Sequence, residues 1–209
     1  MTEPLLLRAL RIARRFGDVE ALAPTDLDLV AGETVALVGA NGAGKSTLLA
    51  ILAGALDPSE GTVETHARVA WVPQRPAHYG RLSARENLEL FARLEGERDP
   101  AQAARGLLER FSLTAGDHPS SELSVGNRQR LNVALSLLGD PRVLLLDEPT
   151  ASLDPGQRRR VWEVVTALRG EGGAICFATQ NVEEVGHADR VLALQDGRVV
   201  GSSVDEVFA

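Results

Sequence analysis

The residues with the clearest chemical potential form a glycine-rich segment, residues 39–46 (GANGAGKS). Its spacing is that of a phosphate-binding loop, G-x-x-x-x-G-K-S/T. The glycines let backbone N–H groups turn toward phosphate oxygens, Lys45 adds a full positive charge, and Ser46 offers a hydroxyl to Mg²⁺. A simple glycine turn is the plain alternative. We expect nucleotide contacts at Gly39, Asn41, Gly42, Ala43, Gly44, Lys45, Ser46 and Thr47.

A second motif places two acids at the end of an apolar run, residues 143–148 (VLLLDE). Asp147 would emerge at the carboxyl edge of a parallel sheet, beside the phosphate loop, where it can hold Mg²⁺. Glu148 is placed to accept a proton from a water molecule that attacks the γ-phosphate. A solvated strand end is the alternative, but the pairing with a phosphate loop favours hydrolysis.

The elements around these motifs predict an α/β protein. An apolar strand at residues 34–39 precedes the loop, and a helix at residues 45–53 follows it. Further apolar runs predict a mainly parallel sheet, because strands buried on both faces are continuously hydrophobic. Segments 5–14 and 25–30 mix polar and apolar residues, which predicts a small antiparallel β layer. The additional strands of the parallel sheet are expected at residues 69–72, 143–147, 174–179 and 191–195.

The stretch from residue 77 to 138 differs, because helical patterns replace the strands. Helices are expected at residues 83–95 and 100–111, with a capping box formed by Ser83 and Glu86 and with Pro100 in a first turn. A further helix is expected at residues 127–138. We therefore predict one domain, a phosphate-loop NTPase core at about 1–76 and 139–209 with an α-helical insertion subdomain at about 77–138.

Composition limits the classes of partner. The chain has 209 residues, 44% of them hydrophobic, and a net charge of −7, which provides no general basic surface for nucleic acid. The longest apolar runs are far shorter than a membrane helix, and the N-terminus does not have the order of a secretory signal, so a cytoplasmic location is expected. The lone cysteine, Cys176, lies in an apolar run and predicts a buried thiol.

Five further residues or short motifs lie along the chain in this order: Phe16, Gln74 in WVPQ, LSVGN at residues 123–127, SLD at residues 152–154, and Gln180. With them, the chain resembles the ATP-binding (nucleotide-binding domain) subunit of an ABC transporter, of the exporter type, over nearly its whole length. The resemblance implies ATP and Mg²⁺ as cofactors, with Phe16 stacked on adenine. It also implies Mg²⁺ contacts from Ser46, Gln74 and Asp147. Taken alone, Phe16 could be a core aromatic and Gln74 a surface amide.

The LSVGN segment precedes a predicted helix, so its hydroxyl and the helix N-terminus could form a second anion site. The resemblance implies that each ATP lies between the phosphate loop of one subunit and this signature of another. It implies signature contacts from Leu123, Ser124, Val125, Gly126 and Asn127, and a loop across the dimer interface formed by Ser152, Leu153 and Asp154. Asp154 could instead be a helix N-cap. A homodimer and a heterodimer both remain open.

Two departures from the family pattern concern turnover. The usual Gly-Gly-Gln of the signature is Val125, Gly126 and Asn127, and Gln180 stands where the family has a switch histidine. Glutamine can donate a hydrogen bond to the γ-phosphate, but it carries no charge near neutral pH. We expect slow but active hydrolysis, with Lys45, Glu148 and Gln180 as the catalytic residues.

The resemblance implies a separate transmembrane permease as partner and a position on the inner face of the cell membrane. Residues 75–96 resemble a segment of exporter-type subunits, which favours export over import. Tyr79, Leu82 and Leu88 are candidate permease contacts, or else pack the helical insertion. The alternatives are a non-transport ABC ATPase, which the acidic charge disfavours, and a regulatory module with impaired hydrolysis.

Overall fold

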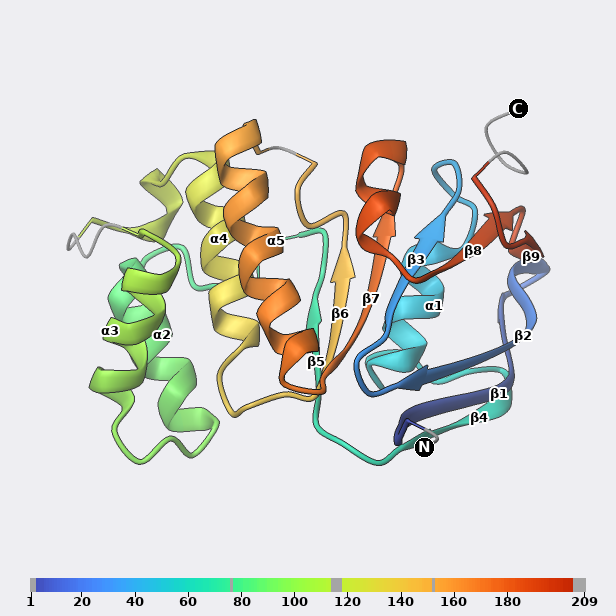
Figure 1. The fold of residues 1–209 in the computed structure, drawn as a ribbon, viewed down its shortest axis with the longest axis horizontal. Coiled ribbons are helices and arrows are strands. Elements are labelled where there is room, and N and C mark those ends of the chain that lie inside the picture. Colours follow the sequence, from blue (N-terminus) through green and yellow to red (C-terminus); the bar gives the residue numbers. More distant parts are fainter. Residues whose placement is uncertain (1–2, 76, 114–117, 152, 205–209) are drawn as a thin grey trace.

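The computed structural model describes residues 3–75, 77–113, 118–151 and 153–204. It contains a six-stranded sheet of order β5-β6-β7-β3-β8-β9 and a three-stranded sheet of order β2-β1-β4. Figure 1 shows the three-stranded sheet at one end of the molecule and helices α2 and α3 at the other. In the part of the chain that is described, no helix is long and apolar enough to cross a bilayer.

The large sheet is parallel except at one edge. Adjacent strands β5, β6, β7, β3 and β8 pair in parallel, whereas β9 runs antiparallel to β8. Every residue of β3, β6 and β7 is buried, which explains their continuous apolar sequence and confirms the predicted parallel sheet. Its strands are β5 (Val69–Val72), β6 (Val143–Asp147), β7 (Ala174–Thr179), β3 (Thr34–Val38), β8 (Arg190–Gln195) and β9 (Arg198–Gly201).

The predicted antiparallel layer is confirmed and is larger than expected. It consists of β1 (Leu5–Phe16), β2 (Val19–Val30) and β4 (Glu60–Thr65). The sequence of β4, EGTVET, gave no apolar signal because only Val63 is even partly buried. Gly61 in β4 has φ 82°, and a Cβ atom there would clash with the backbone of Leu10 and Arg11.

The predicted starts of the first two helices of the helical part are confirmed. Ser83 and Glu86 form the capping box of α2 (Ala84–Leu94), and Asp99 caps α3 (Pro100–Arg110). Ser124 caps α4 (Val125–Ser136), so that helix begins two residues before the predicted start. The sequence prediction missed α5 (Pro155–Gly170) as an element. The remaining helical elements are α1 (Lys45–Leu52) and the short turns η1 (Ser120–Glu122) and η2 (Val182–His187).

Alternate residues of the central strands enter two separate apolar clusters. Leu144 and Leu146 of β6 pack with α2, α3, α4 and α5, whereas Val143 and Leu145 pack with α1 and the antiparallel sheet. The predicted burial of Cys176 is confirmed: its side chain is fully buried in the second cluster, and burial raises the pKa of its thiol. The sheet is thereby held rigidly from both faces.

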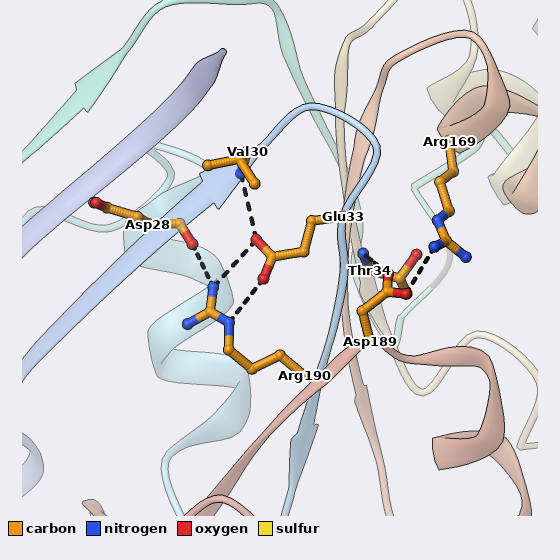
Figure 2. Close-up of polar contacts among 7 residues, drawn as sticks. All are labelled: Asp28, Val30, Glu33, Thr34, Arg169, Asp189 and Arg190. Carbon is orange, nitrogen blue, oxygen red and sulfur yellow. Dashed lines mark hydrogen bonds and ion pairs between the residues drawn. The ribbon is translucent and has the colours of Figure 1, made fainter. Parts of the chain in front are cut away.

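A polar network lies at the amino ends of β3 and β8 (Figure 2). The guanidinium of Arg190 pairs with Glu33 at 2.8 Å and donates to the Asp28 carbonyl at 2.6 Å. Asp189 accepts the Thr34 N–H at 2.8 Å and the Arg169 guanidinium at 2.7 Å. The network ties the β2–β3 turn to the end of α5 and the start of β8, at the edge opposite the phosphate loop.

Asp189→Ala is expected to lower the free energy of unfolding by about 1–2 kcal/mol, because the N–H of buried Thr34 loses its acceptor. Urea denaturation measures the change. Glu109→Ala on an exposed face of α3 is the control and should leave the midpoint nearly unchanged. An Asp189→Ala midpoint equal to that of the wild type would contradict a stabilising role for this network.

Candidate functional site

The glycine-rich loop lies between β3 and α1, as its sequence predicted. The Lys45 ammonium donates hydrogen bonds to the carbonyl oxygens of Gly39 at 2.7 Å and Ala40 at 3.0 Å. Only 6% of Lys45 is exposed. Burial lowers the pKa of Lys45, while the nearby carboxylates of Glu148 and Asp147 act in the opposite direction. The loop therefore holds its positive group in place at the floor of the site.

Gly39 lets this loop lie directly on strand β8. A Cβ atom at Gly39 would clash with the Leu194 carbonyl oxygen and lie 3.0 Å from the Cβ of Ala43. Further along the loop, Gly42 and Gly44 have φ values of 83° and 103°, which favour glycine. These conformations turn the backbone around a concave surface.

The carboxyl end of β6 brings Asp147 to the same place. Asp147 is 3% exposed, and burial raises the pKa of its carboxyl group, while a hydrogen bond from Ser46 and the charge of Lys45 act to lower it. A serine hydroxyl beside a carboxylate forms an oxygen donor set of the kind that Mg²⁺ prefers. The chemistry of the pair fits the expected metal.

Glu148 and Gln180 complete the edge of the site. The Gln180 side-chain amide donates to Asn41 at 2.8 Å and to the Glu148 carboxylate at 3.1 Å. Glu148 has φ 51°, a region that non-glycine residues rarely occupy, and its N–H donates to the Ala178 carbonyl at 3.0 Å. Such backbone conformations cluster at functional sites. Gln180 thus connects the phosphate loop to the acidic end of β6.

The phosphate loop, Asp147 and Glu148 line one pocket of about 130 Å³, and Gln180 lies outside its lining but contacts it through Asn41 and Glu148. Gln74, on the loop after β5, also reaches it, and Gly39 contributes its carbonyl to the Lys45 contact. Ala21 of β2 lines the pocket too and was missed, because an alanine in a strand carries no chemical signal. The lining is Ala21, Asn41, Gly42, Ala43, Gly44, Lys45, Ser46, Thr47, Gln74, Asp147 and Glu148.

Phe16 lies outside this lining, at the end of β1. It is 49% exposed, and the Arg14 guanidinium lies 4.6 Å from the centre of its ring. The alternative that Phe16 is a core aromatic is therefore wrong. An exposed ring at the edge of the antiparallel sheet is free to stack on a planar group.

The LSVGN residues form a separate surface at the start of α4. Ser124 accepts the Asn127 N–H at 3.2 Å, and Val125 is 52% exposed. The side chain of Asn127 contacts the Arg130 guanidinium. Gly126 packs so closely on Gln157 of α5 that a Cβ atom would clash with its amide. These residues do not line the phosphate pocket, so a site that uses both surfaces needs a second subunit.

The loop before α5 has a structural role. Asp154 accepts the Gln157 N–H at 2.9 Å and caps α5, as the structural alternative predicted. Leu153 is 4% exposed. Ser152, which the resemblance places in the interface loop, lies outside the described residues.

Residues 22–151 match the family model described as ABC transporter. The chain belongs to the ABC transporter family. It is 38% identical to the daunorubicin resistance ATP-binding protein DrrA3 of Streptomyces coeruleorubidus, over 94% of this chain and 67% of that protein. It is also 38% identical to the probable multidrug ABC transporter ATP-binding protein YbhF of Escherichia coli, over 88% of this chain and 34% of that protein. The chain therefore spans about a third of the length of the second relative.

Solved structures of this family share the fold. A dimeric post-hydrolysis state of the ATP-binding cassette MJ0796, bound to ADP and Pi, superposes with a TM-score of 0.87 at 24% identity, over 95% of this chain and 98% of that one. The predicted ABC cassette fold, with its parallel sheet, antiparallel layer and helices, is confirmed.

Gly39→Ala is expected to weaken ATP binding at least about tenfold, or about 1.4 kcal/mol, because the loop must move away from Leu194. Titration with a fluorescent ATP analogue measures the affinity. Gly106→Ala on α3 is the matched control, since a Cβ atom there meets nothing within 4 Å. Wild-type affinity in Gly39→Ala would mean that phosphate binding does not depend on this loop conformation.

Proposed function

We propose that this chain is the ATP-binding and ATP-hydrolysing subunit that drives movement of a substrate across a membrane through a separate permease. The observation that carries the proposal is the convergence on one pocket of a phosphate loop, a buried lysine and two acids, with the Gln180 amide bonded to Asn41 and Glu148 of that lining. Family membership and the similarity to ATP-binding proteins of drug exporters support it.

In this proposal the chain's own groups hold the triphosphate in place for attack by water. Backbone N–H groups of the loop and the Lys45 ammonium bind phosphate oxygens, and Phe16 stacks on the adenine. Mg²⁺, held by Ser46, Asp147 and Gln74, would neutralise charge on those oxygens when bound. Glu148 accepts a proton from the attacking water, and the Gln180 amide donates to the γ-phosphate. Thr47 donates to the α-phosphate.

The second half of each site comes from another subunit. The N-terminus of α4, with Ser124 and Gly126, binds the γ-phosphate from across a dimer interface that Asp154 lines, whereas the Leu153 side chain is buried in the core. ATP then stabilises the closed dimer, and hydrolysis opens it. Because both half-sites lie on one chain and Glu148 is present, two identical subunits suffice.

Glu148→Gln is expected to lower turnover by at least about 10²-fold, because the site loses its general base, while ATP binding is kept. Steady-state phosphate release measures turnover, and sedimentation measures the dimer, which should persist longer with ATP in the variant. Glu163→Gln, at an exposed position of α5, is the control. Equal turnover in wild type and Glu148→Gln would overturn the assignment of the base.

Wild-type turnover near zero, unchanged by a membrane partner, would instead favour a regulatory module with impaired hydrolysis. The observation behind that second candidate is Gln180, whose amide carries no charge. The complete set of Lys45, Asp147 and Glu148 supports the active enzyme.

We propose that the permease docks in a groove of about 260 Å³ next to Gln74, between β5 and the helical part at residues 77–138. Trp71, Phe91 and Leu135 line this groove and are partly exposed. A short permease segment with apolar side chains would cover the exposed parts of these residues. The chain then lies on the inner face of the membrane, with export favoured.

The candidate docking residues differ in how exposed their side chains are. Tyr79 is 58% exposed and lies 6.0 Å from the Phe91 ring, which lines the groove. Leu88 is fully buried in the core, so its assignment as a docking contact is wrong. Leu82 is half-buried.

Ala77→Arg is expected to lower the amount of permease that co-purifies in mild detergent about tenfold, because the side chain fills an exposed position in the groove. Quantitative mass spectrometry of material purified from the host measures it. Ala101→Arg on the exposed face of α3 is the matched control. Recovery of only soluble or ribosomal proteins with the wild type would favour a non-transport ATPase.

A further inference from the structure

The turn that carries Gln180 is held from behind by a buried acid. Glu184 of η2 is 6% exposed, and its carboxylate accepts the Thr179 hydroxyl at 2.7 Å. Thr179 is the last residue of β7, is 1% exposed, and immediately precedes Gln180. The two side chains therefore connect η2 to the end of the central strand.

The same hydroxyl also fixes the backbone that follows. The Asn181 N–H donates to the Thr179 hydroxyl oxygen at 3.0 Å, and the Glu184 N–H donates to the Asn181 carbonyl at 3.0 Å. Residues 179–184 thus fold back on themselves around one buried hydroxyl. From this turn, the Gln180 side chain reaches the other way, to Asn41 and Glu148.

Glu184 is costly to keep at this position. Burial raises the pKa of Glu184, and the charge of Glu148 acts in the same direction, while the Thr179 hydrogen bond and Arg158 lower it. Within the described ranges, no lysine or arginine forms an ion pair with Glu184. If both members of the Thr179–Glu184 pair were apolar side chains of similar shape, the stability of the protein would be nearly unchanged or higher. The geometry that Glu184 imposes on Thr179 therefore explains the residue better than stability does.

We propose that Glu184 is a positioning residue for ATP hydrolysis, which acts through the Thr179 hydroxyl to aim the Gln180 amide at the site between Asn41 and Glu148. The proposal rests on the proposed function and extends it to two residues outside the pocket. A glutamine side chain is long and loses much rotamer freedom when it is fixed, so its amide depends strongly on a fixed backbone. A displacement of about 1 Å at a reacting centre costs on the order of 10²-fold in rate.

The test compares variants of the hydrogen-bonded pair. Thr179→Val removes the hydroxyl with little change in shape, Glu184→Leu removes the acceptor, and Glu184→Gln keeps an acceptor oxygen. We expect kcat to fall about tenfold or more in the first two, with the KM for ATP within about twofold of wild type. Glu184→Gln should keep most of the activity. The double variant Thr179→Val with Glu184→Leu should be no slower than either single variant.

Thr25→Val is the matched control for stability. Thr25 is also buried, at 4% exposure, and its hydroxyl donates to the Ala23 carbonyl at 2.8 Å, in a strand of the antiparallel sheet. It loses the same atoms as Thr179→Val, so both should lower the denaturation midpoint. Only Thr179→Val should change kcat. An equal fall of kcat in Thr179→Val and Thr25→Val would mean that Thr179 acts only by stabilising the fold.

A Gln180→Ala background decides whether the effect passes through Gln180. In that background, Glu184→Leu and Thr179→Val should change kcat by less than about twofold. If they still lower kcat tenfold, the inference is wrong. If the wild-type protein neither binds an ATP analogue nor hydrolyses ATP, the proposed function itself is wrong. Measuring ATP-analogue binding by each variant distinguishes that result from a failure of the positioning role alone.

Discussion

The parallel, in-register pairing of β3, β7 and β6 is the constraint on which the site depends. Val38 of β3 pairs with Thr179 of β7, and Asp147 of β6 pairs with Ala178. Since parallel strands end at the same edge, the residues that follow them leave the sheet at nearly the same level. The phosphate loop, Glu148 and Gln180 meet for this reason, although they lie far apart along the chain.

Burial of charge at that edge sets the character of the site. Lys45 and Asp147 are both almost fully buried. Burial lowers the pKa of Lys45 and raises the pKa of Asp147, so it favours the neutral form of each group. Such groups are expensive for folding and useful for binding, because charges interact strongly where water is excluded. The two apolar clusters on either face of the sheet and the polar network around Asp189 stabilise the framework that carries this cost.

Gln180 gives the site an uncharged connection between the phosphate loop and Glu148. Its amide can hold Asn41 and Glu148 at one time, but only if its backbone is fixed. The position of that backbone depends in turn on Thr179, the last residue of β7, and on Glu184, which accepts the Thr179 hydroxyl. The position of the Gln180 amide thus depends on two residues outside the pocket, Thr179 and Glu184.

The sequence by itself determined the motifs, the parallel strands and the capped helices, because apolar periodicity, glycine spacing and cap residues are local properties. It did not reveal β4, whose residues are mostly exposed, or α5 as an element. It could not separate buried Leu88 from exposed Tyr79, since both are apolar residues of one segment. Only the tertiary structure decided the contacts of Gln180 and of Glu184, because these join atoms whose proximity depends on strand order and packing, which no local pattern encodes.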